Sequence, residues 1–189
     1  MSIKYHDAIV GFTRGASGAI EEWDFTSATP LIGIRRSTVL SGYNLDASQF
    51  TSDGILLQDS NDYILLGSLP RARYVIEVDV QSMSLPILSG NHQRFIMADD
   101  DEGFIYRYNS HQWEFYGTSG WAASSGEGDP SFFSGATVRC EIDANNYWHI
   151  YRNGVLWYEP NVPSSLRSFR LGSDANSLRN ATIAGMRFL

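Results

Sequence analysis

One continuous stretch, residues 136–160, constrains the fold of this chain more than any other. Between residues 138 and 142 apolar side chains alternate with polar ones, and a period of two is typical of a β-strand with one buried face. A second strand is predicted after the polar turn at 144–146, and a third follows Asn153-Gly154, which supplies the two positive φ angles of a tight hairpin turn. The stretch therefore predicts an antiparallel meander of three strands.

The composition of the whole chain is that of an ordered globular protein. Of its 189 residues 43% are hydrophobic and 19% are charged, which is enough apolar surface for a core and too much for a disordered chain. Strand-like alternation recurs along the chain, most clearly at 73–81, and no long amphipathic helix or internal repeat is evident. Because β-sandwiches of this length form one unit, we expect a single domain over residues 1–189.

Charge and cysteine content exclude several classes of function. A net charge of -7 and an isoelectric point near 5.0 argue against nucleic-acid or anionic-lipid binding, because both need clustered Lys and Arg. The one cysteine, Cys140, has the apolar parity of its strand, so we expect a small buried hydrophobe and no disulfide scaffold. No apolar run has the length of a signal peptide or of a membrane span, so we expect neither signal peptide nor membrane insertion.

The meander resembles a strand-turn-strand pattern of concanavalin A-like (laminin G-like) jelly-roll domains. The match runs through Val138, Cys140, Ile142, Asp143, Trp148, Tyr151, Asn153, Gly154 and Val155. The resemblance implies an all-β fold, an antiparallel two-sheet jelly-roll sandwich of the lectin/glucanase type with about a dozen short strands. Such domains include lectins, adhesion modules, polysaccharide hydrolases and lyases, and parts of virions, so the resemblance implies a scaffold and leaves the chemistry open.

Residues 77–81, Glu-Val-Asp-Val-Gln, resemble the E-x-D-x-E strand of laminarinase-type glycoside hydrolases. Alternation places Glu77, Asp79 and Gln81 on one sheet face, and a retaining glycosidase needs two carboxyl groups about 5 Å apart. Gln81 stands where the acid/base glutamate belongs, and an amide does not exchange a proton near neutral pH. We therefore expect no catalysis; a polysaccharide-cleaving enzyme of this fold is the alternative.

An acidic run is the chain's candidate for a metal site. Asp99, Asp100 and Asp101, followed by Glu102, offer the oxygen ligands that calcium prefers. No spaced Asp/Asn pattern accompanies them, so a solvated hairpin turn is the favoured interpretation and calcium is the one cofactor left open. The histidines have no partner at a metal-ligand spacing.

The sequence indicates two kinds of ligand about equally, a glycan and a protein partner. Carbohydrate sites set an aromatic ring against the C–H face of a sugar and place polar groups at its hydroxyls. Residues 118–135 break the strand pattern and are expected to form a functional loop. The candidate ligand-binding residues are Trp121 in this loop and the outward or strand-end residues His149, Tyr151, Arg107, Glu77 and Asp79. The same residue types also suit a protein interface.

Residues 12–17, Phe-Thr-Arg-Gly-Ala-Ser, resemble the openings of many phage tail and virion proteins. This resemblance implies a decoration, fibre or tail component that attaches to glycans or to other virion subunits. Such a component would reach the virion or the extracellular space by particle assembly. The resemblance also implies a homo-oligomer, such as a trimer. A lectin-like cell-adhesion module is the further alternative.

Overall fold

The computed structural model describes residues 20–36, 38–59, 61–68, 74–86, 92–97, 102–107, 109–117, 120–161, 168–172 and 179–189. These residues form fifteen β-strands and one short 3-10 helix, Ala47–Gln49, with no α-helix among them. Within these ranges, no helix has the length and apolar character needed to cross a membrane. The predicted all-β class is confirmed.

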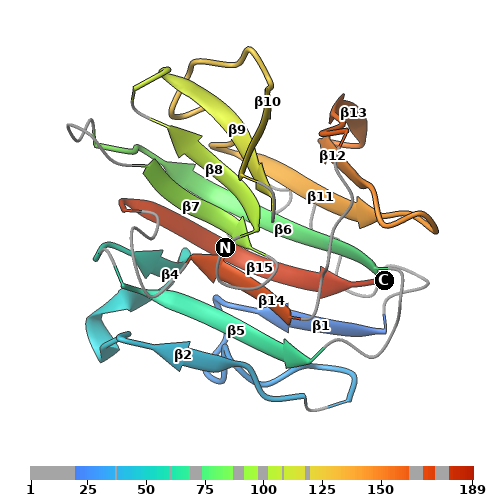
Figure 1. Cartoon of the computed structure of the whole chain (residues 1–189). Coiled ribbons are helices and arrows are strands. Elements are labelled where there is room, and N and C mark those ends of the chain that lie inside the picture. The colour runs from blue at the N-terminus through green and yellow to red at the C-terminus, as the bar shows by residue number, and fades with distance from the viewer. Residues whose placement is uncertain are drawn as a thin grey trace.

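The first of two sheets has eight strands (Figure 1). Across the sheet the order is β13 (Val155–Tyr158), β12 (Trp148–Arg152), β11 (Ala136–Ile142), β6 (Tyr74–Met83), β15 (Ala181–Phe188), β4 (Gly54–Leu57) and β3 (Phe50–Thr51), while β1 (Glu21–Asp24) also pairs with β15. The predicted meander is β11–β12–β13, and its tight turn has φ of 50° at Asn153 and 78° at Gly154. The prediction of three antiparallel strands here is confirmed.

The second sheet has seven strands, in the order β10 (Gly120–Ser124), β9 (Gln112–Gly117), β8 (Gly103–Arg107), β7 (His92–Met97), β14 (Ser168–Gly172), β5 (Tyr63–Ser68) and β2 (Ser41–Tyr43). The prediction that residues 118–135 form one long loop is wrong for β10, which pairs with β9 through Trp121 and Tyr116. Gly, Ala and Ser show no apolar alternation on such an edge strand, so the sequence did not reveal it.

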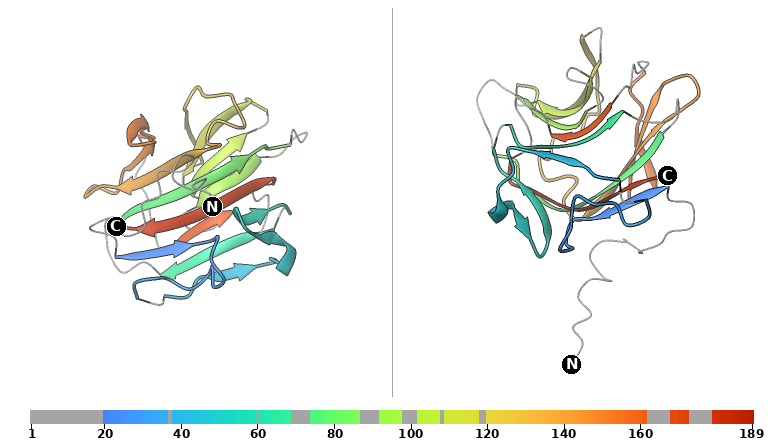
Figure 2. Two further views of the ribbon diagram at one scale, coloured as in Figure 1. Left: turned by 180° about the vertical axis from the view of Figure 1, so that it is seen from behind. Right: turned by 90° about the horizontal axis from the view of Figure 1, so that it is seen from below.

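The two sheets lie one over the other and share one hydrophobic core (Figure 2). Fully buried side chains from both sheets meet in it, among them Val78, Val138, Ile150, Phe104, Trp113 and Phe115. Aromatic side chains of β8 and β9 pack together in the core, with the ring centres of Phe104 and Trp113 stacked at 5.3 Å. Cys140 is buried as expected, and burial raises the pKa of its thiol, so it packs as a small hydrophobe. The fold is an antiparallel two-sheet sandwich.

Candidate functional site

The outer face of the eight-stranded sheet, directed away from the core, carries a row of polar side chains. Five of these side chains lie side by side on neighbouring strands, each paired in register with the next: Glu22 of β1, Arg187 of β15, Glu77 of β6, Arg139 of β11 and Tyr151 of β12. We call these five residues the polar row. Glutamate and arginine alternate along it, so each charge has the opposite charge on the next strand.

The centre of the polar row is a buried ion-pair cluster. Arg187 Nη2 lies 3.1 Å from Glu77 Oε2 and 3.7 Å from Asp79 Oδ2. Thr137 Oγ1 donates a hydrogen bond of 2.6 Å to Asp79 Oδ1. Burial raises the pKa of Asp79 to about 6, although the Thr137 hydrogen bond and the Arg187 charge act in the opposite direction. Asp79 is 1% exposed, so its carboxyl group does not reach a ligand in solution.

The third residue of the Glu-x-Asp-x-Gln pattern lies at an irregularity of the strand pairing. Thr182 pairs with Ser82 and Ile183 with Val80, which makes Gln81 the extra residue of a β-bulge. Glu77 and Asp79 share the outer face as predicted. The bulge interrupts the regular pairing with β15 at Gln81, so the shared face of Gln81 with Glu77 and Asp79 stays a prediction.

The accessible end of the polar row lies on β11 and β12. The guanidinium of Arg139 lies 5.3 Å from the centre of the Tyr151 ring and donates a hydrogen bond of 2.9 Å to Glu141. The side chains of Arg139 and Glu141 are 36% and 33% exposed. Cation–π stacking and the ion pair fix the ring, the guanidinium and the carboxylate relative to one another. This end of the polar row is a polar surface that is partly exposed to solvent.

His149 lies beside this surface, opposite Glu141 in the register, as its parity predicted. Its Nδ1 is 2.6 Å from Glu159 Oε1, and its Nε2 is 3.5 Å from Asp143 Oδ2. Burial lowers the pKa of His149, but the hydrogen bonds and charges of Glu159 and Asp143 outweigh burial, so the pKa is raised. The imidazole is thereby held in one orientation.

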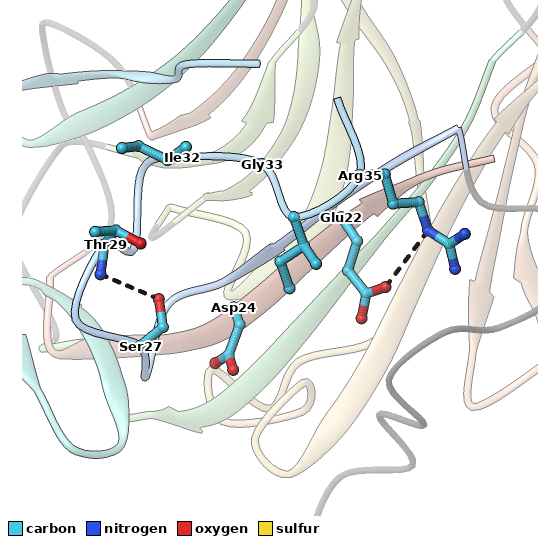
Figure 3. A pocket seen from close by; sticks show the side chains of 8 residues that line it. Glu22, Asp24, Ser27, Thr29, Ile32, Gly33 and Arg35 are labelled. Carbon is cyan, nitrogen blue, oxygen red and sulfur yellow. Dashed lines mark hydrogen bonds and ion pairs between the residues drawn. The ribbon is translucent and has the colours of Figure 1, made fainter. Parts of the chain in front are cut away.

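A pocket of about 530 Å³ opens at the β1 end of the polar row (Figure 3). Glu22 and Asp24 point to the same side of β1 at its floor, and their side chains are almost fully buried. Arg35 Nε lies 3.8 Å from Glu22 Oε2, and Ile32 and Ile34 give the pocket a partly exposed apolar wall. Ser27, Thr29 and Gly33 complete its lining.

The pocket depends on a loop that the sequence did not reveal as part of a site. The Ile34 amide donates to the Glu22 carbonyl at 2.8 Å, which lays the loop along β1. The Glu21 carboxylate accepts hydrogen bonds from the backbone amides of Arg35, Arg36 and Thr38. Burial acts to raise the pKa of Glu21, but hydrogen bonds from Arg35, Glu22 and Thr38 outweigh burial and lower the pKa below its usual range. No motif or periodicity in the sequence signals contacts between segments so far apart. The sequence therefore did not indicate Glu22, Asp24 or Arg187 as site residues.

The six predicted ligand-binding residues are divided between the two sheets. Glu77, Asp79, His149 and Tyr151 lie on the eight-stranded sheet, as described above. Arg107 lies on β8, where its Nη1 is 3.4 Å from Glu114 Oε2, and Trp121 lies on β10. Their role in binding stays a prediction.

The calcium candidates Asp99, Asp100 and Asp101 lie outside the described residues. In the part of the chain that the structure describes, no group of three or more His, Cys, Asp or Glu side chains could hold a metal ion.

Known proteins resemble this chain in fold and not in sequence. No protein-family model and no curated protein sequence matches the chain. Trypanosoma rangeli sialidase in complex with sialic acid superposes over 92% of this chain with a TM-score of 0.62 and 13% identity, and the match spans 31% of the sialidase. The chain thus corresponds to less than a third of that enzyme.

Two further solved structures share the sandwich. Domain 4 of an extracellular arabinanase from Geobacillus stearothermophilus, in complex with arabinotriose, gives a TM-score of 0.62 at 17% identity over 90% of this chain and 91% of that domain. The ligand-binding domain of botulinum neurotoxin serotype D, in complex with N-acetylneuraminic acid, gives 0.55 at 14% identity over 90% of this chain and 46% of that domain. At these identities the similarity establishes the fold alone.

Proposed function

We propose that the chain is a non-catalytic carbohydrate-binding module that binds glycans on the outer face of the eight-stranded sheet. The observation that carries the proposal is the Arg139–Tyr151 stack, with Glu141 and His149 beside it. A partly exposed aromatic group with fixed polar neighbours matches the way proteins contact the C–H face and the hydroxyl groups of a sugar. Because the cation–π contact and the ion pairs already hold these side chains, little conformational entropy is lost on binding.

The fold comparisons support a carbohydrate ligand. The arabinanase domain was solved with arabinotriose and the toxin domain with N-acetylneuraminic acid. The arabinanase domain matches this chain over nearly the whole length of both, so it is a unit of comparable size. A shared fold does not transfer a site, and the proposal therefore rests on the Arg139–Tyr151 surface.

Glycoside hydrolysis is the second candidate, because the pKa of Asp79 is raised to about 6 next to Glu77. A general acid must reach the glycosidic oxygen within hydrogen-bonding distance. Asp79 is 1% exposed, and Arg187 contacts both its carboxylate and that of Glu77. Burial and ion pairing thus favour a structural role for the two carboxylates. Reducing ends released from a polysaccharide panel, and lost in Glu77→Gln, would reverse this preference.

A glycan array followed by calorimetry tests the binding proposal. Tyr151→Ala and Arg139→Gln are expected to weaken binding of an array hit by about tenfold or more, because each removes half of the stacked surface. Tyr43→Ala is the matched control, since Tyr43 is 41% exposed and lies on the seven-stranded sheet. Equal loss of affinity in all three variants, or full affinity in Tyr151→Ala, would contradict the proposed site.

Four narrower statements remain proposals: a virion role, a homotrimer, a single domain and a lectin-like adhesion module. A virion role rests on residues 12–17, which lie outside the described residues. Light scattering tests the accompanying homotrimer, and a stable monomer would count against it. One domain over residues 1–189 is supported by the single core that joins both sheets. A lectin-like adhesion module would use the same surface and would differ in binding a glycan of intact cells.

A further inference from the structure

The outer face of the seven-stranded sheet carries three arginines in a diagonal line. Arg107 lies on β8, Arg94 on β7 and Arg170 on β14, which are neighbouring strands. Arg94 pairs with Ile105, two residues before Arg107, and Arg170 pairs with Met97 beyond the bulge of β7. Each arginine is therefore one strand across and about two residues along from the previous one, a step of about 8 Å.

On the next strand, β5, an aromatic residue lies beside Arg170 but is set back along the sheet towards the level of Arg94, because β14 runs antiparallel to β7. Tyr63 of β5 pairs with Gly172, two residues after Arg170, and the Arg170 guanidinium lies 5.5 Å from the Tyr63 ring centre. Tyr63 in turn stacks on Tyr43 at 4.4 Å. We call Arg107, Arg94, Arg170 and Tyr63 the arginine track. It crosses four adjacent strands.

Neighbouring side chains orient the arginines of the track. Arg107 Nη1 is 3.4 Å from Glu114 Oε2, and Arg94 Nε is 3.4 Å from His92 Nε2. Ile105 lies between them on the same face and is 1% exposed, so the side chains around it cover it. Burial, with the charges of Arg94 and Arg107, lowers the pKa of His92, which therefore adds no charge of its own at neutral pH.

The two outer faces differ in charge. On the strands of the seven-stranded sheet, the described outward residues include three arginines and one acidic residue, Glu114. The opposite outer face carries Glu22, Glu77 and Asp79 around Arg187, in a chain whose net charge is -7. Among the described strand residues, basic side chains thus outnumber acidic ones on this face, and a basic surface raises the local concentration of anionic ligands.

We infer that the arginine track binds an extended acidic polysaccharide, a polymer with carboxylates repeated along its chain. The planar guanidinium matches a carboxylate in shape and can bind it through two parallel hydrogen bonds. Regular steps between the three arginines need a polymer that repeats its charge, and Tyr63 offers a ring for a sugar beside Arg170. This site is separate from the polar row and does not depend on the function proposed there.

Calorimetric titration of the full chain with a de-esterified oligogalacturonide tests the inference, with the methyl-esterified oligomer as the neutral match. We expect the acid to bind and the ester to give no signal. Arg94→Gln and Arg170→Gln should each weaken binding by about tenfold, the usual worth of one charged hydrogen bond. Arg36→Gln changes the net charge equally at an exposed position outside the track and should bind as the wild type does.

Further variants separate binding from folding. Arg170→Lys keeps the charge and loses the planar fork, so it should weaken binding less than Arg170→Gln while both unfold at the wild-type temperature. Tyr151→Ala should leave oligogalacturonide affinity unchanged, which distinguishes this site from the polar row. Binding of the ester, an equal loss in Arg36→Gln, or equally tight binding of a single-stranded oligonucleotide would overturn the inference.

Discussion

At the scale of single residues, the carboxyl group of Asp79 links protonation to folding near neutral pH. Its folded pKa of about 6 lies above the ordinary value of 3.8, so the folded state holds the proton more tightly than the unfolded chain. The free energy of unfolding should therefore fall as pH rises from about 4 to about 6, and level off above. Glu77, Arg187 and Thr137 contact this carboxyl group or shift its pKa, so it acts as one part of a cluster.

Replacing Asp79 by asparagine tests this linkage. Asp79→Asn keeps an acceptor for Thr137 and removes the buried charge. At pH 7 the substitution should raise the free energy of unfolding by on the order of 3 kcal/mol, since a shift of one pKa unit corresponds to about 1.36 kcal/mol. At pH 4, where Asp79 is protonated, it should change the free energy of unfolding little. Urea denaturation between pH 4 and 8 measures the effect, with the exposed Asp53→Asn as control. A variant whose stability keeps the wild-type dependence on pH would show that another group is responsible.

At the scale of strands, the β12–β13 turn ties the edge of the eight-stranded sheet to β11. Asn153 Oδ1 accepts a hydrogen bond of 2.9 Å from the Thr137 amide, and the Asn153 amide donates one of 2.9 Å to the Thr137 carbonyl. Both turn residues have positive φ, which asparagine and glycine tolerate and most residues do not. The turn therefore sets the register that brings Tyr151 opposite Arg139.

Substitutions in this turn should lower stability to different degrees. Gly154→Ala is expected to cost about 1 kcal/mol, because φ of 78° is unfavourable for alanine although no atom lies within 4 Å of its added Cβ. Asn153→Ala should cost about 2 kcal/mol, since it also removes the Thr137 bond. Urea denaturation gives both values, and equal stability of the two variants would mean that the side-chain bond contributes nothing.

The same strands show what the sequence can and cannot predict. The meander was predictable because alternation and Asn153-Gly154 are local signals that agree with each other. The β-bulge at Gln81 was not predictable from the sequence, because it arises from the pairing of β6 with β15, two strands far apart in the chain. For the same reason, the partners of Glu77 and the pocket over Glu22 could be found only once β1 and β15 were placed beside β6.

At the scale of the molecule, the polar row and the arginine track lie on opposite outer faces of the sandwich, separated by the shared core. Packed sheets lie about 10 Å apart, and at physiological salt the Debye length is about 8 Å, so a charge bound on one face has little effect on the other. Energetic coupling between the two faces would need a core that can adopt two alternative packing arrangements. Dense aromatic packing, such as that of Phe104 and Trp113, favours a single arrangement.

We therefore expect the two faces to bind independently. Saturation with oligogalacturonide should change the affinity for a glycan of the polar row by less than about twofold at physiological salt, and reciprocity requires the same factor in the reverse titration. At low salt a weak dependence can appear, because screening of the bound carboxylates decreases. Calorimetric titration of each ligand in the presence of the other measures the coupling, with Arg170→Gln as the variant in which it should vanish. Strong coupling at physiological salt, or direct competition, would mean that the two ligands share one site.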